Sequence, residues 1–303
     1  MKVFPLQIVT CFTTSLFLAS FASAQCPIDP LNNTSWAFHT EAADYNSFGG
    51  TSSIGSFKIS RIADSRNIGQ FIYSLTGSMT VNAGNRIVRL APISGKPQLE
   101  GAGGTLQFSD GGQGVLWQFV FANNCKEMNL VNEVYLDNQT LNKVMDGKAV
   151  KIESPAACPP NSFLLLDPAF APTGWSFHAE SSAFLPGTFG SSGSASIGTL
   201  SPRYVASGGT DRRTFGTLSA VVSTNVGSFN GGSAVYRLAP TAGTYQVYPD
   251  CSGGTLQLQL GPYATQFEFV FADPTYSQLF LLSTNVTAYG SRSDLFSGVA
   301  KKF

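Results

Sequence analysis

The chain has 303 residues, in which 18 Lys plus Arg balance 18 Asp plus Glu, and charged residues make up only 12%. A neutral surface cannot attract phosphates through counterion release, so the composition argues against a nucleic-acid partner. Few charges together with 24 Phe and 31 Gly favour short antiparallel strands over helices or disorder.

The first 24 residues have the features of a secretory signal peptide. Lys2 follows the initiator Met, residues 3–21 are mostly apolar, and residues 22–24 (ASA) have the small side chains of a cleavage site. The segment is interrupted too often by Ser and Thr for a good membrane span, and no other stretch reaches about 18 uninterrupted apolar residues. The sequence therefore predicts a secreted, extracellular protein without a transmembrane segment.

The rest of the chain is a tandem duplication. Residues 36–41 (WAFHTE) return as 175–180 (WSFHAE), and residues 119–122 (FVFA) return as 269–272. The offset is 139 residues at the first match and 150 at the last, which indicates a duplicated domain and not a solenoid repeat. The predicted organisation is a signal peptide at 1–24, copy one at 25–152, a linker at 153–157 and copy two at 158–303.

Each copy consists of short alternating runs separated by Gly, Ser, Asn and Pro, which predicts strands joined by turns. In copy two, residues 256–260 (LQLQL) and 267–271 (FEFVF) flank a turn and predict a hairpin with one apolar face. We expect about eight strands per copy; in copy one they lie near Trp36 and at 54–59, 70–75, 79–81, 87–90, 105–108, 117–121 and 128–134. Antiparallel strands without helical crossovers favour an all-β tandem of closed barrels, with a β-sandwich as the alternative.

Four cysteines remain once Cys11 leaves with the signal peptide, and an even number in an exported chain indicates two disulfides. Cys26 and Cys158 each precede the first Trp of a copy. Cys125 and Cys251 lie at the same end of the equivalent predicted hairpin, where one strand begins about 5 Å from the end of its partner. We therefore predict the pairs Cys26–Cys125 and Cys158–Cys251.

Asn-X-Ser/Thr sequons mark four candidate glycosylation sites: Asn32, Asn33, Asn138 and Asn285. Chance sequons are the alternative in a chain this rich in Ser, Thr and Asn.

Residues 243–256 (GTYQVYPDCSGGTL), followed by 267–270 (FEFV), resemble a widespread group of secreted bacterial domains. Those domains have an N-terminal Cys, a G-T-Y-x-V-x-P-D-C-[ST]-G-T-L segment and a Phe-rich strand. The resemblance covers most of copy two and implies an exported β-domain with no assigned activity. Copy one departs from the pattern, because Gly101 replaces the Cys and residues 96–97 (KP) replace Thr-Tyr.

A second resemblance is to lipocalin-like (calycin) barrels. In that group a first-strand Trp packs at the base of the barrel under a basic residue of the last strand. Trp175 after Gly174, with Lys301 and Lys302 near the end of the chain, is similar to this arrangement.

The two histidines occupy the same place in both copies, each two residues before a Glu. His39 and Glu41, like His178 and Glu180, share one face of a strand. A carboxylate beside an imidazole raises its pKa and is suited to general base catalysis or to half a metal site. If the Trp and Phe side chains fill the barrels, both pairs face outward, and we favour this surface interpretation. Two ligands per copy are too few for zinc, so no metal or cofactor is predicted.

Arg89 and Arg237 also recur, each before Leu-Ala-Pro. A buried Arg can hold an anionic ligand through its planar fork. An outward Arg whose stem covers apolar surface is the alternative that we favour.

The candidate ligand-binding residues are Trp36, His39, Glu41, Arg89, Trp175, His178, Glu180 and Arg237. No pattern supports nucleophilic catalysis, because no G-x-S-x-G motif occurs and the Gly-rich pieces lie between strands.

Three functions follow from these features. The first is an exported, non-catalytic pair of barrels that binds a small apolar or glycan-type ligand or a surface partner. The second is a cyclase or isomerase that works in a barrel lumen. The third is a structural or adhesive envelope protein with two equal binding units.

Overall fold

The structure, a computed structural model, describes residues 26–42, 51–62, 71–82, 87–110, 113–135, 145–152, 174–184, 191–204, 215–227, 233–237, 241–248, 250, 252–260, 263–273, 277–286 and 296–303. The predicted signal peptide (1–24) and linker (153–157) lie outside these residues, as do Asn138, Cys158 and Cys251.

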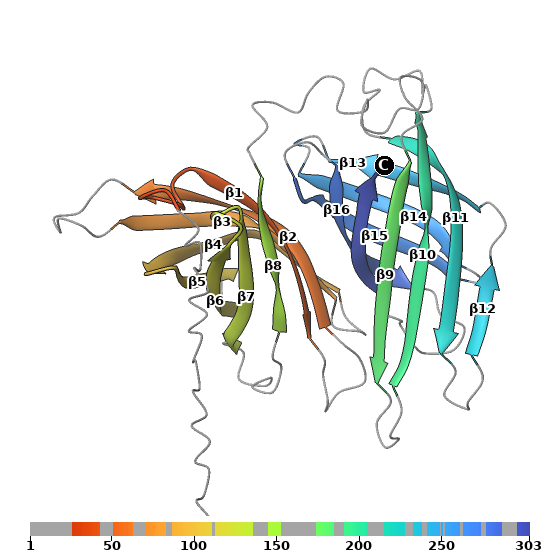
Figure 1. Cartoon of the computed structure of the whole chain (residues 1–303), viewed down its shortest axis with the longest axis horizontal. Helices are drawn as coiled ribbons and strands as arrows, with labels where there is room; N and C mark the ends of the chain where they lie inside the picture. Colours follow the sequence, from red (N-terminus) through yellow and green to blue (C-terminus); the bar gives the residue numbers. More distant parts are fainter. Residues whose placement is uncertain are drawn as a thin grey trace, which may run out of the picture.

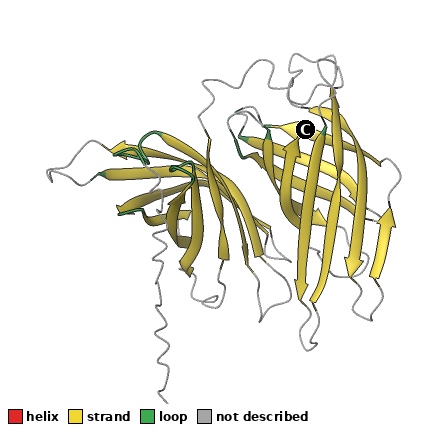
Figure 2. Ribbon diagram, viewed as in Figure 1, coloured by secondary structure: helices red, strands yellow, loops and turns green. Residues whose placement is uncertain are grey.

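The described part of the chain consists of strands and their connections, without a helix (Figure 2). Copy one contains β1 (Thr34–Ala42), β2 (Thr51–Ile62), β3 (Ile72–Asn82), β4 (Ile87–Glu100), β5 (Gly103–Asp110), β6 (Gln113–Ala122), β7 (Glu127–Tyr135) and β8 (Met145–Ile152). Copy two contains β9 (Trp175–Phe184), β10 (Ser191–Tyr204), β11 (Phe215–Gly227), β12 (Ser233–Arg237), β13 (Thr241–Val247), β14 (Gly253–Leu260), β15 (Tyr263–Phe271), β16 (Gln278–Val286) and β17 (Phe296–Lys302).

Each copy closes into an antiparallel barrel, and the two barrels lie side by side (Figure 1). In barrel one, β1 to β8 follow chain order and β8 pairs with β1. In barrel two, β17 pairs with β9, and the added pairing of β10 with β11 completes the ring. The strands β12 and β13 both pair with β11 and together occupy the place of β4. The prediction of two tandem eight-stranded barrels is confirmed, and closure excludes the sandwich.

Strand register confirms the predicted hairpin and corrects the strand list of copy one. In β14 and β15, Leu256 lies opposite Phe267, as the alternation predicts. The runs at 70–75 and 79–81 are one continuous strand, β3, which bulges between Gly77 and Met79 instead of turning. The strand β8 was not among the predicted strands, although it closes barrel one.

Inward aromatic side chains fill both barrels. Trp36 and Phe38 belong to the core of barrel one, and Trp175 and Phe177 belong to the core of barrel two. Burial of each such side chain stabilises the fold by about 1.5–3 kcal/mol. Because Gly55 and Gly198 lie opposite the two Phe residues in register, a Cβ at either glycine would come within 2.7 Å of the ring. The glycine and the inward Phe therefore form a matched pair in each copy.

The segment before β1 packs onto barrel one. Leu31 is part of its core cluster, and the Tyr73 hydroxyl donates a hydrogen bond to Asp29 Oδ1 at 2.5 Å. Cys26 is bonded to Cys125, with Cα atoms 5.4 Å apart, so this predicted disulfide is confirmed. Asn32 and Asn33 are exposed in this segment, whereas Asn285 lies in β16.

The outer faces of the two barrels contact each other through a small apolar cluster. Its buried members are Ala37, Ile54, Val270, Ala272, Phe280 and Leu282. Two polar contacts flank it: Asn82 Nδ2 donates to the Ser283 carbonyl at 2.6 Å, and Arg89 Nε lies 3.3 Å from Glu268 Oε2. We call the outer side of β1–β3 the docking face of barrel one and that of β15–β17 the receiving face of barrel two.

Candidate functional site

The duplicated His–Glu pairs lie on the outer surfaces of the barrels. Because Phe38 and Phe177 point inward, the alternate residues of β1 and β9 point outward. His39 Nε2 lies 3.3 Å from Glu41 Oε1, and His178 Nε2 lies 3.2 Å from Glu180 Oε1. This is the orientation expected when aromatic side chains fill the barrels.

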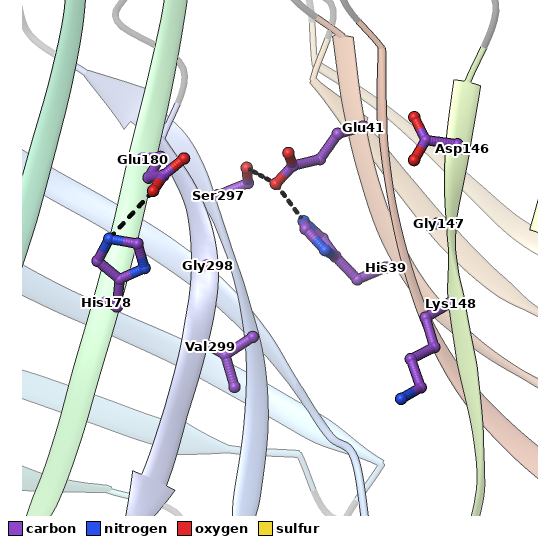
Figure 3. Close-up of a pocket in the computed structure, with 10 residues that line it drawn as sticks. All are labelled: His39, Glu41, Asp146, Gly147, Lys148, His178, Glu180, Ser297, Gly298 and Val299. Carbon is purple, nitrogen blue, oxygen red and sulfur yellow. Dashed lines mark hydrogen bonds and ion pairs between the residues drawn. The ribbon is translucent and has the colours of Figure 1, made fainter. Parts of the chain in front are cut away.

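Both pairs line a single cleft between the barrels, as Figure 3 shows. The cleft has a volume of about 420 Å³. Its lining residues come from β1 and β8 of barrel one and from β9 and β17 of barrel two: His39, Glu41, Asp146, Gly147, Lys148, His178, Glu180, Ser297, Gly298 and Val299. Sequence reasoning identified each pair separately, and the structure brings the two pairs together.

The two imidazoles have different surroundings despite their identical sequence positions. The His39 side chain is 14% exposed and stacks on Phe280 of barrel two, with ring centroids 5.7 Å apart. Burial lowers the pKa of His39, and the nearby carboxylates of Glu41 and Asp146 oppose this shift only in part. The His178 side chain is 55% exposed. One histidine is therefore part of the barrel junction, and the other is open to solvent.

Carboxylates dominate the charge of the cleft. Glu41, Asp146 and Glu180 face one lysine, Lys148. The Lys148 Nζ is 2.5 Å from Glu127 Oε2 outside the cleft, and its hydrogen bond lowers the pKa of Glu127. Because this ammonium already has an acidic partner, the cleft has a surplus of negative charge. Glu41 Oε1 also accepts a hydrogen bond from Ser297 Oγ at 2.5 Å, which links the two barrels across the cleft.

The other predicted ligand-binding residues lie elsewhere. Trp36 and Trp175 are in the barrel cores, and Trp36 Nε1 donates to Thr34 Oγ1 at 2.8 Å. Arg89 faces outward, and its partner is Glu268 of barrel two. Arg237 lies in β12, but its side chain is outside the described part of the structure.

Glu268 is the centre of a polar group at the junction. It is nearly buried, and its Oε1 accepts a hydrogen bond from the Tyr248 hydroxyl at 3.1 Å. Burial, with the charge and hydrogen bond of Glu268, raises the pKa of Tyr248 to about 12. Arg89 therefore helps to hold barrel two against barrel one and does not bind within the cleft.

The interior of barrel two leaves little free space near Trp175. A cavity of about 20 Å³ lies there among apolar side chains that include Tyr245 and Phe269. This is enough for about one water molecule and is far below the size of a ligand site.

Six lining residues were not predicted from the sequence. Two are the equivalent glycines Gly147 and Gly298, and the other four are Asp146, Lys148, Ser297 and Val299. The duplication could not reveal them, because Asp146 corresponds in register to Ser297 and Lys148 corresponds to Val299. Neither pair is alike in residue type. The only available signal was the outward alternation of Asp146 and Lys148, which is visible once β8 is known to be a strand.

Two further observations concern metals and membranes. Within the described residues, no group of three or more His, Cys, Asp or Glu side chains is arranged to hold a metal ion. In the same part of the chain, no helix has the length and hydropathy needed to span a membrane.

Comparison with known proteins gives distant structural likenesses. No protein-family model matches the chain. No curated protein sequence matches it. A crystal structure of a mutant of the vaccine antigen Transferrin Binding Protein B from Haemophilus parasuis Hp5 is similar, with 10% identity over 89% of this chain and 76% of that chain and a TM-score of 0.25. The MucA/MucB complex of Pseudomonas aeruginosa matches with 11% identity over 90% of this chain and 89% of that chain, with a TM-score of 0.14. We assign no function from likenesses at this level.

Proposed function

We propose that this chain is an exported, non-catalytic binding protein that takes a small glycan-type ligand in the cleft between its two barrels. The observation that carries the proposal is the convergence of both duplicated His–Glu pairs on that one cleft. The disulfide Cys26–Cys125 and the resemblance of copy two to secreted bacterial domains support export.

The shape of the molecule favours the cleft over a barrel lumen as the binding site. A volume of about 420 Å³ falls in the usual range of small-molecule sites, about 300–1,000 Å³, whereas the cavity inside barrel two is about 20 Å³. An enzyme site within a lumen would need His178 and Glu180 to point inward, and both lie on the outer surface. These observations favour binding outside the barrels.

The chemistry of the cleft favours a neutral or amine-bearing sugar over an apolar or acidic ligand. Carboxylate oxygens accept hydrogen bonds from hydroxyl and ammonium groups, and each imidazole can donate or accept one. Glu41, Asp146 and Glu180 would repel an acidic sugar, since the ammonium of Lys148 is paired with Glu127. A ligand rich in hydroxyl groups, with or without an amine, satisfies this set of partners.

A glycan array probed with the full secreted chain tests the proposal. We expect binding to neutral or amine-bearing glycans and a loss of about tenfold or more in Glu180→Gln, because a charged acceptor of hydrogen bonds is removed from the cleft. Glu100→Gln, an exposed carboxylate outside the cleft, should bind as the wild type does. The proposal would be overturned by equal binding of the two variants. Native mass spectrometry that finds a co-purifying apolar molecule would also overturn it.

A further inference from the structure

The two barrels contact each other through different faces. Each copy therefore also carries the face that the other copy uses, and that face is not part of the contact between the barrels. Barrel one contributes its docking face (β1–β3), and barrel two contributes its receiving face (β15–β17). By register, the docking face of barrel one corresponds to the outer side of β9–β11, and the receiving face of barrel two corresponds to the outer side of β6–β8. We call the exposed outer side of β9–β11 the free docking face. We call the exposed outer side of β6–β7 the free receiving face.

Residues that are buried at the junction have apolar counterparts that are exposed on the free faces. Ile54 and Ile197 hold the same position, opposite His39 and His178, yet Ile54 is 1% exposed and Ile197 is 58% exposed. Val221 lies on the strand beside Ile197, diagonally across from it, and is also exposed. The free docking face thus keeps an apolar centre that is not covered within the chain.

The free receiving face shows the same contrast. Val270 is 7% exposed, whereas its counterpart Val120 is 57% exposed. Leu282 is fully buried, whereas its counterpart Val131 is 46% exposed. Among the described residues, nine large apolar side chains are exposed, and four of these nine (Val120, Val131, Ile197 and Val221) lie on the two free faces. Single apolar side chains scattered over the surface are normal for a soluble protein, but a concentration of exposed apolar side chains on the two free faces indicates an interface.

We infer that two copies of this chain associate head to tail, with the free docking face of one molecule on the free receiving face of the next. The contact repeats the geometry of the internal junction, in which one face meets a different face. Such a heterologous contact closes into a ring or continues as a filament, depending on the rotation between units. The inference does not rest on the proposed ligand, although His178 and Glu180 lie both on the free docking face and in the cleft.

The contact between molecules is weaker than the internal one, and the sequence shows why. Phe280 of the junction is replaced by Asn129, so the imidazole of His178 has no aromatic partner there. Ser297, which donates to Glu41, is replaced by Asp146 of β8, beside the free receiving face, and Asp146 would face Glu180 with a like charge. The association is therefore favourable through Ile197, Val221, Val120 and Val131 but limited by polar and charged substitutions.

Sedimentation velocity over a concentration series tests this contact with the full secreted chain. The wild type should show reversible association, and a chain that stays monomeric at all concentrations would overturn the inference. Ile197→Asp and Val120→Asp should each lower the association constant about tenfold or more, because each buries a charge in the contact. Ile72→Asp replaces an exposed apolar residue outside both free faces and should associate as the wild type does. Unchanged thermal unfolding would show that all three variants are folded.

Mixing the two variants distinguishes a head-to-tail contact from a symmetric one. Val120→Asp keeps an intact free docking face, and Ile197→Asp keeps an intact free receiving face. We therefore expect a 1:1 mixture of the two variants to form dimers and no larger species. Failure of the mixture to dimerise would overturn the head-to-tail arrangement. Asp146→Ser should raise the association constant about tenfold, since it removes the like charge facing Glu180. An unchanged constant in that variant would overturn the equivalence of the internal and external contacts.

Discussion

His39 of barrel one stacks on Phe280 of barrel two, with ring centroids 5.7 Å apart and 26° between the ring planes. Its duplicated counterpart, His178, is largely exposed, and the counterpart of Phe280 is Asn129. Equivalent histidines therefore differ in one chain: His39 packs at the barrel junction, and His178 is exposed. This difference in packing should appear as a difference in stability when the residues involved are substituted.

Removal of the Phe280 ring should destabilise the protein strongly. Phe280→Ala removes a buried side chain from the apolar cluster and leaves a cavity, so we expect a loss of about 3–5 kcal/mol in the free energy of unfolding. Urea denaturation followed by circular dichroism measures this loss. Asn129→Ala changes the equivalent exposed position and should cost less than about 0.5 kcal/mol. Similar losses in both variants would contradict the placement of Phe280 at the junction.

The two histidines should differ in the cost of removal. His178→Ala should cost under about 1 kcal/mol, because its side chain is solvated. His39→Ala also removes the ring that packs on Phe280, so its cost should exceed that of His178→Ala when both are measured by urea denaturation at neutral pH. A larger loss for His178 than for His39 would contradict the structure.

Stability should fall as the pH drops below neutrality, and His39 should account for part of this fall. Burial lowers the folded-state pKa of His39 below the ordinary value of 6.5, so the unfolded chain binds this proton more readily. The contribution of His39 is fully present above about pH 6.5 and is lost as the pH falls through its folded-state pKa. Urea denaturation between about pH 5 and 8 should show a shallower slope in His39→Gln. Asn129→Ala leaves His39 in place and removes no titratable group, so it should retain the wild-type slope.

The Arg89–Glu268 pair should show non-additive energetics. Arg89→Ala leaves the nearly buried carboxylate of Glu268 with Tyr248 as its remaining partner and should cost about 1 kcal/mol, a modest value because the Arg89 side chain is half exposed. Glu268→Gln keeps an acceptor for the Tyr248 hydroxyl without a charge. In the double variant we therefore expect a loss smaller than the sum of the two single losses, as a double-mutant cycle measures. Strict additivity would indicate that the two side chains do not interact.

The disulfide between Cys26 and Cys125 should stabilise barrel one substantially. It closes a loop with a sequence separation of 99 residues, for which the chain-entropy model gives up to about 4–5 kcal/mol. Cys26→Ser combined with Cys125→Ser should lower the unfolding temperature by the same amount as reduction of this bond in the wild type. No change in the double variant would contradict a stabilising role.

The second disulfide, Cys158–Cys251, remains a prediction from the repeat. Non-reducing peptide mapping of the secreted protein should find these two residues in one linked peptide. Detection of either residue as a free thiol would contradict the prediction.

Local pattern and duplication were enough to predict the barrels but not their junction. The alternation at 256–260 predicted β14 and its partner, and the equivalence of the copies predicted the pairing of Cys26 with Cys125. The strand β8 escaped prediction because Asp146, Gly147 and Lys148 interrupt its apolar pattern, and charged residues and Gly are depleted in strands.

The cleft could not be predicted for a different reason. His39 and His178 lie in similar sequences, WAFHTE and WSFHAE, and the outward orientation of both follows from alternation. Which outward side chain becomes covered depends on how the second barrel packs against the first, and this is decided by residues such as Phe280, Leu282 and Ile54, which lie far apart in the chain. A pattern that repeats cannot distinguish its two copies.

The last strand, β17, has two roles that couple folding steps. It closes barrel two by pairing with β9, and it also presents Ser297 and Val299 toward barrel one. During synthesis, barrel one has all its strands once β8 has emerged, whereas barrel two must wait for residues 296–302. Closure of the second barrel and the contacts of β17 with the first barrel therefore belong to one late event, and a chain that terminates before β17 would lose both.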